Sequence, residues 1–178
     1  MFKKTNIILE ACVETLSEAE NAVKFGANRI ELCSHLDLDG LTPNKKTIVD
    51  VLERISVPVK VMIRPREGDF IYDEEEVKHM ESSILFCKKN GVSHIALGVL
   101  NKFNEIDSRL MSKLSEISKP MDITFHKAID HTDDMEKQLE VLCSLGMVKS
   151  VLTAGGKGSL LENRDSAKIL LDRFSSRI

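Results

Sequence analysis

The strongest constraint on the fold is a regular alternation of short apolar runs with amphipathic segments along the chain. Short runs rich in β-branched residues are typical of buried strands, and apolar residues at spacings of three and four are typical of helices. A repeated strand–helix order predicts an α/β fold with a parallel sheet and right-handed crossovers. Six strands are predicted, at 7–13, 29–33, 59–63, 94–97, 122–125 and 149–152.

Helix start and stop signals separate the predicted strands. A capping residue followed by an acidic residue or proline marks a helix start, and glycine marks an end. The predicted starts are Ser17–Glu20, Thr42–Pro43, Asp73 with Glu76, and Asp107, and Gly146 is predicted to close the fifth helix.

Two architectures fit six strand–helix units, a doubly wound open sheet and a (β/α)8 TIM barrel. A dinucleotide-binding open sheet places glycines after its first strand, and residues 12–16 contain none. Polar residues follow every predicted strand, where barrel enzymes build their active sites. We therefore predict one TIM-barrel-type domain over residues 1–178, with six of the eight units present.

Composition limits the possible partners. A net charge of −3 supplies no basic field for nucleic acid, and the sequence contains no apolar run of the roughly 20 residues that a membrane span needs. Glu10 and Glu14 interrupt the N-terminal region, so no signal peptide is predicted. The four cysteines form no C-x-x-C pair, which argues against a zinc ribbon and fits free thiols in a reducing cytoplasm.

Two arginines follow the third predicted strand. Pro65 has no N–H for a sheet ladder, so Arg64 and Arg66 lie where a buried strand opens into a loop. A guanidinium fork suits carboxylate or phosphate, which makes both arginines candidates for binding a small anionic substrate. The alternative is that they pair with carboxylates of this same chain.

Two E-x-C units end the first two strands. Glu10 and Cys12 alternate along one strand, and Glu31 and Cys33 along the next, so each carboxylate points the same way as its thiol. If that direction is inward, two carboxylates and two thiols gather beside the arginines.

The ends of the fifth and sixth strands add further candidates. His126 would titrate as an acid or base near neutral pH, with Asp130 in the loop beyond, and the backbone of the Gly155–Gly156 turn could hold an anion. The candidate catalytic residues are Glu10, Glu31, His126 and Asp130, and the candidate anion-binding residues are Arg64, Arg66, Thr153, Gly155 and Gly156. A ring of internal salt bridges closing the barrel is the structural alternative.

The segments ANRIELCS, GLTP, VKVMIRPREGDF, ITFHKAID and VLTAGG closely resemble the CutC family of copper-homeostasis proteins, which have a TIM-barrel fold. The resemblance covers essentially the whole chain, with mild departures at Ala11, Lys127 and Ala154, where the family usually has valine, arginine and serine. Family members continue through two further βα units after the position where this chain ends.

The resemblance implies a role in copper homeostasis. Cysteines at the positions of Cys12 and Cys33 are candidate copper(I) ligands in the family, and copper(I) prefers thiolate and thioether. Cys87 and Cys143 lie on apolar helix faces and are expected to pack in the core. An enzyme acting on a small phosphate or carboxylate and a non-catalytic barrel fragment remain open alternatives.

The missing units would leave the first and sixth strands with unpaired edges. Such edges can template pairing with another chain. We therefore expect either a fragment of a longer product or a chain that self-associates, as a homo-oligomer, through its open barrel edges.

Overall fold

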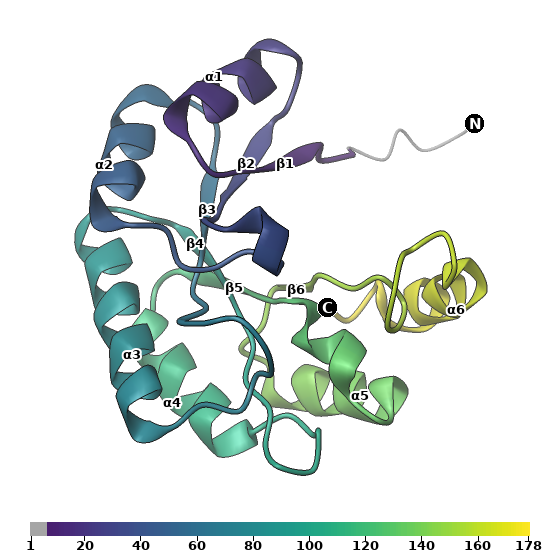
Figure 1. Cartoon of the computed structure of the whole chain (residues 1–178). Helices are drawn as coiled ribbons and strands as arrows, with labels where there is room; N and C mark the ends of the chain where they lie inside the picture. Colours follow the sequence, from purple (N-terminus) through teal and green to yellow (C-terminus); the bar gives the residue numbers. More distant parts are fainter. Residues whose placement is uncertain (1–6) are drawn as a thin grey trace.

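The computed structural model describes residues 7–178 and contains one six-stranded sheet. The predicted domain also includes residues 1–6, which lie outside the described residues. The strands pair in sequence order, each parallel to the next, which confirms the predicted fold class. Figure 1 shows the sheet curling into a half-barrel. The strands are β1 (Glu10–Val13), β2 (Arg29–Leu32), β3 (Val59–Met62), β4 (His94–Leu97), β5 (Asp122–Phe125) and β6 (Ser150–Val151).

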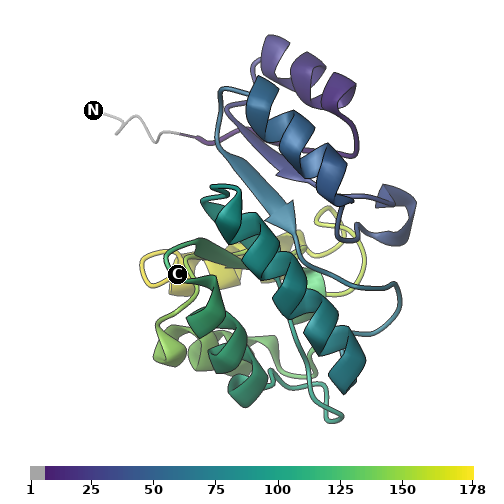
Figure 2. The same cartoon turned by 90° about the vertical axis from the view of Figure 1, so that its left-hand side faces the viewer.

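The helices cover the outer face of this sheet, and Figure 2 shows α1, α2 and α3 as a layer in front of the strands. This is the arrangement that right-handed βαβ crossovers produce. The helices are α1 (Leu16–Lys24), α2 (Lys45–Arg54), α3 (Glu74–Lys89), α4 (Ser108–Ser118), α5 (Met135–Leu145) and α6 (Arg164–Phe174), and two 3₁₀ turns are η1 (Leu36–Leu38) and η2 (Lys127–His131).

Three of the helix signals are confirmed and two are wrong. Asp73 and Asp107 cap α3 and α4, and Gly146 ends α5 in the left-handed conformation. Thr15, rather than Ser17, caps α1, because Thr15 and Glu18 form the reciprocal capping box. Asn44, rather than Thr42, caps α2.

The two faces of the sheet differ in chemistry. The outward side chains pack with the helices into the main apolar core. The inward side chains are mostly polar, although several are buried. The outward set includes Ile30, Leu32, Val61, Ile95, Leu97 and Phe125, and the buried inward polar set includes Glu31, Lys60, Arg64, His94, Thr124 and His126.

Within residues 7–178, β1 and β6 each have only one neighbouring strand. Three exposed apolar residues, Ile7, Ile8 and Leu9, precede β1. The predicted open edges are therefore present over the described part of the chain, while self-association through them stays a prediction. In the same range, no helix has both the length and the apolar character needed to cross a membrane.

Candidate functional site

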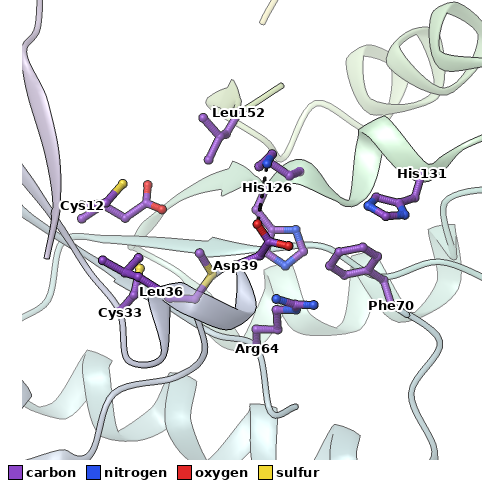
Figure 3. Close-up of a pocket in the computed structure, with 12 residues that line it drawn as sticks. Cys12, Cys33, Leu36, Asp39, Arg64, Phe70, His126, His131 and Leu152 are labelled. Carbon is purple, nitrogen blue, oxygen red and sulfur yellow. Dashed lines mark ion pairs between the residues drawn. The ribbon is translucent and has the colours of Figure 1, made fainter. Parts of the chain in front are cut away.

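A cavity of about 200 Å³ lies at the C-terminal ends of the strands. Figure 3 shows Cys12 and Cys33 toward one end of it, and Phe70 and His131 toward the other. The lining comes from the ends of five strands (β1, β2, β3, β5 and β6) and from the loops after β2, β3 and β5, so residues far apart in sequence meet here. The lining residues are Cys12, Glu31, Cys33, Leu36, Asp39, Met62, Arg64, Phe70, His126, Lys127, His131 and Leu152.

Sulfur atoms form one end of this cavity. Cys12 is exposed, whereas Cys33 is buried in a small cluster with Met62 and Ala96. Gly40 has a positive φ of 84°, and a Cβ there would meet the Cys33 Sγ at 3.3 Å. Met62 lines the cavity together with the two cysteines, so three sulfur-containing side chains border it.

Both thiols are held in the protonated form at neutral pH. Cys12 is exposed as a residue, but partial desolvation of its thiol raises the pKa to about 11, and the negative charges of Glu31 and Glu10 act in the same direction. Burial and the charge of Glu31 raise the pKa of Cys33 as well. A metal ion that binds these sulfur atoms must therefore displace protons.

The backbone of Arg64 is tied to the loop that follows β2. Thr42 Oγ1 accepts the Arg64 N–H at 2.8 Å, and the Thr42 N–H donates to the Arg64 carbonyl at 2.9 Å. These bonds explain why Thr42 does not cap α2. They also fix the point at which the Arg64 side chain enters the cavity.

The Arg64 guanidinium is buried, with 4% of the residue surface exposed. It donates to the carbonyls of Leu38, Gly40 and Gly68 and stacks over Phe70 at 4.9 Å from the ring centroid. No carboxylate in residues 7–178 forms an ion pair with it, and Arg64 Nε has no hydrogen-bond partner there. In the described residues, Arg64 therefore does not pair with an acidic side chain, unlike the structural alternative considered from the sequence.

His126 packs tightly at the end of β5. A Cβ at Gly98 would come within 2.6 Å of His126 Nδ1, so only glycine permits this ring position. His126 Nδ1 accepts the Ala128 N–H at 3.3 Å. Burial lowers the pKa of His126 to about 3, with the charge of Arg64 adding to the effect.

His126 is therefore neutral at physiological pH, which differs from the predicted acid or base titrating near pH 7. Because Nδ1 acts as an acceptor, the ring proton is on Nε2. That N–H is buried and has no acceptor among the residues described.

Lys60 pairs with two carboxylates inside the half-barrel. Its Nζ lies 2.9 Å from Glu10 Oε1 and 3.2 Å from Glu31 Oε2, and 2% of the residue is exposed. Arg29 forms a second ion pair with Glu10. Although burial opposes ionisation of Glu10, Lys60 and Arg29 together lower its pKa, whereas burial raises the pKa of Glu31, which has Lys60 alone.

The two predicted catalytic glutamates therefore have different surroundings. Glu31 lines the cavity, whereas Glu10 pairs with Lys60 and Arg29 and is not among the lining residues.

Arg66 lies outside the cavity lining. Its guanidinium pairs with Asp69 and Glu76 and donates to the carbonyl of Ile71. Arg66 thus matches the structural alternative considered from the sequence, because it pairs with carboxylates of its own chain. These contacts hold the loop after β3.

The Asp130 carboxylate and the turn after β6 are joined by hydrogen bonds. The Asp130 carboxylate accepts the Thr153 hydroxyl, the Ala154 N–H at 2.8 Å and the Gly156 N–H at 3.2 Å. The Gly155 N–H donates to Thr153 Oγ1 at 2.8 Å. The donors expected to hold an external anion at Thr153, Gly155 and Gly156 thus have internal acceptors in this conformation.

Sequence reasoning missed Lys60 as the partner of the two glutamates, and Phe70 and His131 as parts of the cavity. A lysine within the apolar run 59–63 was the available signal, because Lys60 alternates with Met62 and Arg64 on one face of the strand. Nothing local marks Phe70 or His131, because loops position both residues. Across the described range, no group of three or more His, Cys, Asp and Glu side chains could hold a metal ion.

A parallel half-barrel with a cavity at the strands' C-terminal ends places the protein in the TIM-barrel class of α/β proteins. The CutC family model matches residues 7–178, and the chain belongs to the CutC family. This confirms the resemblance seen in the sequence.

Individual relatives agree with this membership. The human copper homeostasis protein cutC homolog is 39% identical over 171 residues, covering 96% of this chain and 62% of that protein. A CutC family protein of Vibrio campbellii is 38% identical over 175 residues, covering 97% and 70% of the two chains. The chain thus spans less than two thirds of the human relative's length.

Solved structures show the same fold. The crystal structure of CutC from Streptococcus agalactiae superposes with a TM-score of 0.89 at 31% identity, over 97% of this chain and 85% of that one. A phosphonomutase-like structure from Burkholderia cenocepacia gives a TM-score of 0.57 at 12% identity, covering 82% and 68% of the chains. That second likeness concerns the fold alone.

Proposed function

We propose that the protein binds copper(I) through the thiols of Cys12 and Cys33, as its contribution to copper homeostasis. The observation that carries this proposal is that both cysteines line the same cavity. They come from the ends of adjacent strands, and the Met62 thioether lies beside Cys33.

The donor set suits a soft cation of low coordination number. Copper(I) prefers sulfur ligands, whereas zinc sites usually have four nitrogen or sulfur ligands. The cavity offers two thiols and one thioether, and no cluster of three or more His, Cys, Asp and Glu ligands occurs in residues 7–178. The name of the human relative, a copper homeostasis protein, supports the same metal.

An anaerobic competition titration with a copper(I) chelator tests the proposal. The unsubstituted protein should take one tight equivalent, and the Cys12→Ser, Cys33→Ser double variant should lose it. Cys143→Ser is the matched control, since Cys143 lies on α5 and is not among the residues lining the cavity. A double variant that keeps its fold by circular dichroism and still takes the tight equivalent would overturn the proposal.

The single variant Cys12→Ser provides a second test in the same titration. Cys12 is exposed, so its replacement leaves the core intact even if loss of the Cys33 thiol destabilises the chain. The single variant should bind copper(I) more weakly than the unsubstituted protein.

A further inference from the structure

Two residues that line the end of the cavity away from the cysteines each carry a buried hydrogen-bond donor without an acceptor in residues 7–178. Arg64 Nε and His126 Nε2 are both buried, and neither has a partner in the described part of the chain. Both residues line the cavity, with 4% and 2% of their surfaces exposed. Buried polar groups are almost always hydrogen-bonded, so each of these donors needs an explanation.

The charges around the cavity also indicate an anionic ligand. Glu31 is paired with Lys60. At the cavity wall, Asp39 Oδ1 lies 3.9 Å from Lys127 Nζ, so these two charges also form a pair. Arg64 is always charged and lacks an ion-pair partner in residues 7–178, which leaves one positive charge uncompensated. Burying such a charge is costly unless an anion accompanies it.

Neighbouring rings hold both donors in place. The Phe70 ring lies 5.2 Å from His126 and 5.1 Å from His131 between centroids, and Arg64 stacks over the same ring. Three carbonyls fix the Arg64 guanidinium from the loop side. The donors are therefore preorganised, which reduces the entropy lost when a ligand binds.

We propose that this end of the cavity binds the carboxylate of a small organic anion, with oxygen atoms accepting from Arg64 Nε–H and His126 Nε2–H. A ligand with one negative charge balances Arg64, whereas a phosphate monoester brings up to two. At about 200 Å³, the cavity is smaller than the roughly 300–1,000 Å³ of pockets for drug-sized ligands, so a small organic anion fits it best.

This inference uses different residues from the copper site. Arg64, His126 and Phe70 make the carboxylate end, whereas Cys12, Cys33 and Met62 make the sulfur end of the same cavity. Metal-free protein is therefore sufficient for the test, and failure of either proposal leaves the other standing.

Isothermal titration of the full chain at constant ionic strength tests the inference, with propionate as the probe. Propionate should bind, while propionamide, its neutral analogue of similar shape, should bind at least about ten-fold more weakly, as expected for losing hydrogen bonds to charged groups. Equal binding of the two would overturn the proposal. Tighter binding of inorganic phosphate than of propionate would overturn the assignment to a carboxylate.

Arg64→Gln should weaken propionate binding by about ten-fold or more. Arg54→Gln is the charge-matched control, since Arg54 pairs with Glu20 on the surface, and it should leave the binding unchanged. Equal affinities for the two variants would overturn the assignment to Arg64.

Arg64 also supports its loop, so a measurement on the unsubstituted protein accompanies the variants. In nuclear magnetic resonance spectra, propionate should shift the Arg64 Nε–H and His126 ring resonances, and propionamide at the same concentration should shift them less. Unshifted resonances at saturating propionate would overturn the proposal even if Arg64→Gln fails to fold.

Discussion

At the scale of single residues, the polar side chains inside the half-barrel divide into an internal ion-pair network and an unsatisfied set. Lys60 with Glu10 and Glu31 belongs to the first group. Arg64 and His126 belong to the second. In the first group each charge has a partner, whereas the second group marks where a ligand is expected.

Lys60→Met should reduce the free energy of unfolding by about 3–5 kcal/mol, because it leaves two carboxylates in the barrel interior without their shared cation. Lys46→Met is the matched control, since Lys46 pairs with Asp50 on the exposed face of α2, and its loss should cost under about 1 kcal/mol. Urea unfolding of both variants measures the difference. A cost below about 1 kcal/mol for Lys60→Met would show that the network adds little stability.

Residue types at strand ends were predictable, but their partners were not. The alternation of Glu10 with Cys12 and of Glu31 with Cys33 predicted shared directions along each strand. The register between strands and the curvature of the sheet decide which carboxylate pairs with Lys60, Arg29 or Arg66. The alternation of side chains within one strand gives no information about either. This is why Arg64 and Arg66, two residues apart, have different environments.

At the scale of elements, polar side chains tie down the loops after β2, β3 and β6, and Phe70 adds apolar packing in the loop after β3. Thr42 ties the β2 loop to Arg64, Arg66 ties together the β3 loop, and Asp130 ties η2 to the turn after β6. The helix starts show the limit of prediction at this scale. Thr15 and Ser17 are both good capping residues, and only the observed bond from the Glu18 N–H to Thr15 Oγ1 decides between them.

Asp130→Ala should release the turn after β6. The amide protons of Ala154 and Gly156 lose their carboxylate acceptor, so their hydrogen exchange should accelerate by about ten-fold or more. Asp133→Ala, at an exposed neighbouring position, is the control and should leave both rates unchanged. Unaltered exchange at Ala154 and Gly156 in Asp130→Ala would contradict the structural role assigned to this carboxylate.

At the scale of the whole molecule, strand order followed from the sequence because every strand is separated from the next by a helix. Right-handed crossovers then place consecutive strands side by side. The curvature was less directly predictable, since an open sheet has the same alternation. The absence of glycines after the first strand and the polar residues at the strand ends favoured the barrel. The polar interior could not be predicted without knowing which face of each strand points inward.

Acid should destabilise the whole fold through its buried histidines. Burial lowers the pKa of His94 to about 4 and that of His126 to about 3, below the value of about 6.5 in an unfolded chain. Between pH 6.5 and 4 the unfolded chain binds protons that the folded chain does not. Stability is therefore present above pH 6.5 and falls as pH falls, by up to about 1.4 kcal/mol per pH unit for each histidine.

Urea unfolding at pH 7, 6 and 5 measures this slope. His94→Gln should reduce it by the share of one histidine, because His94 Nε2 lies 2.8 Å from Thr124 Oγ1 inside the sheet and its charged form is disfavoured there. Identical slopes for His94→Gln and the unsubstituted protein would show that His94 is not held neutral by the fold.

We propose that copper(I) binds at the sulfur end of the cavity, between the ends of β1 and β2. X-ray absorption at the copper edge of the anaerobic, copper(I)-loaded protein tests it most directly. We predict a first shell of sulfur at about 2.3 Å, the length of a metal–thiolate bond, that is lost in the Cys12→Ser, Cys33→Ser variant. A first shell of nitrogen or oxygen alone, or a sulfur shell that survives in the double variant, would contradict the claim.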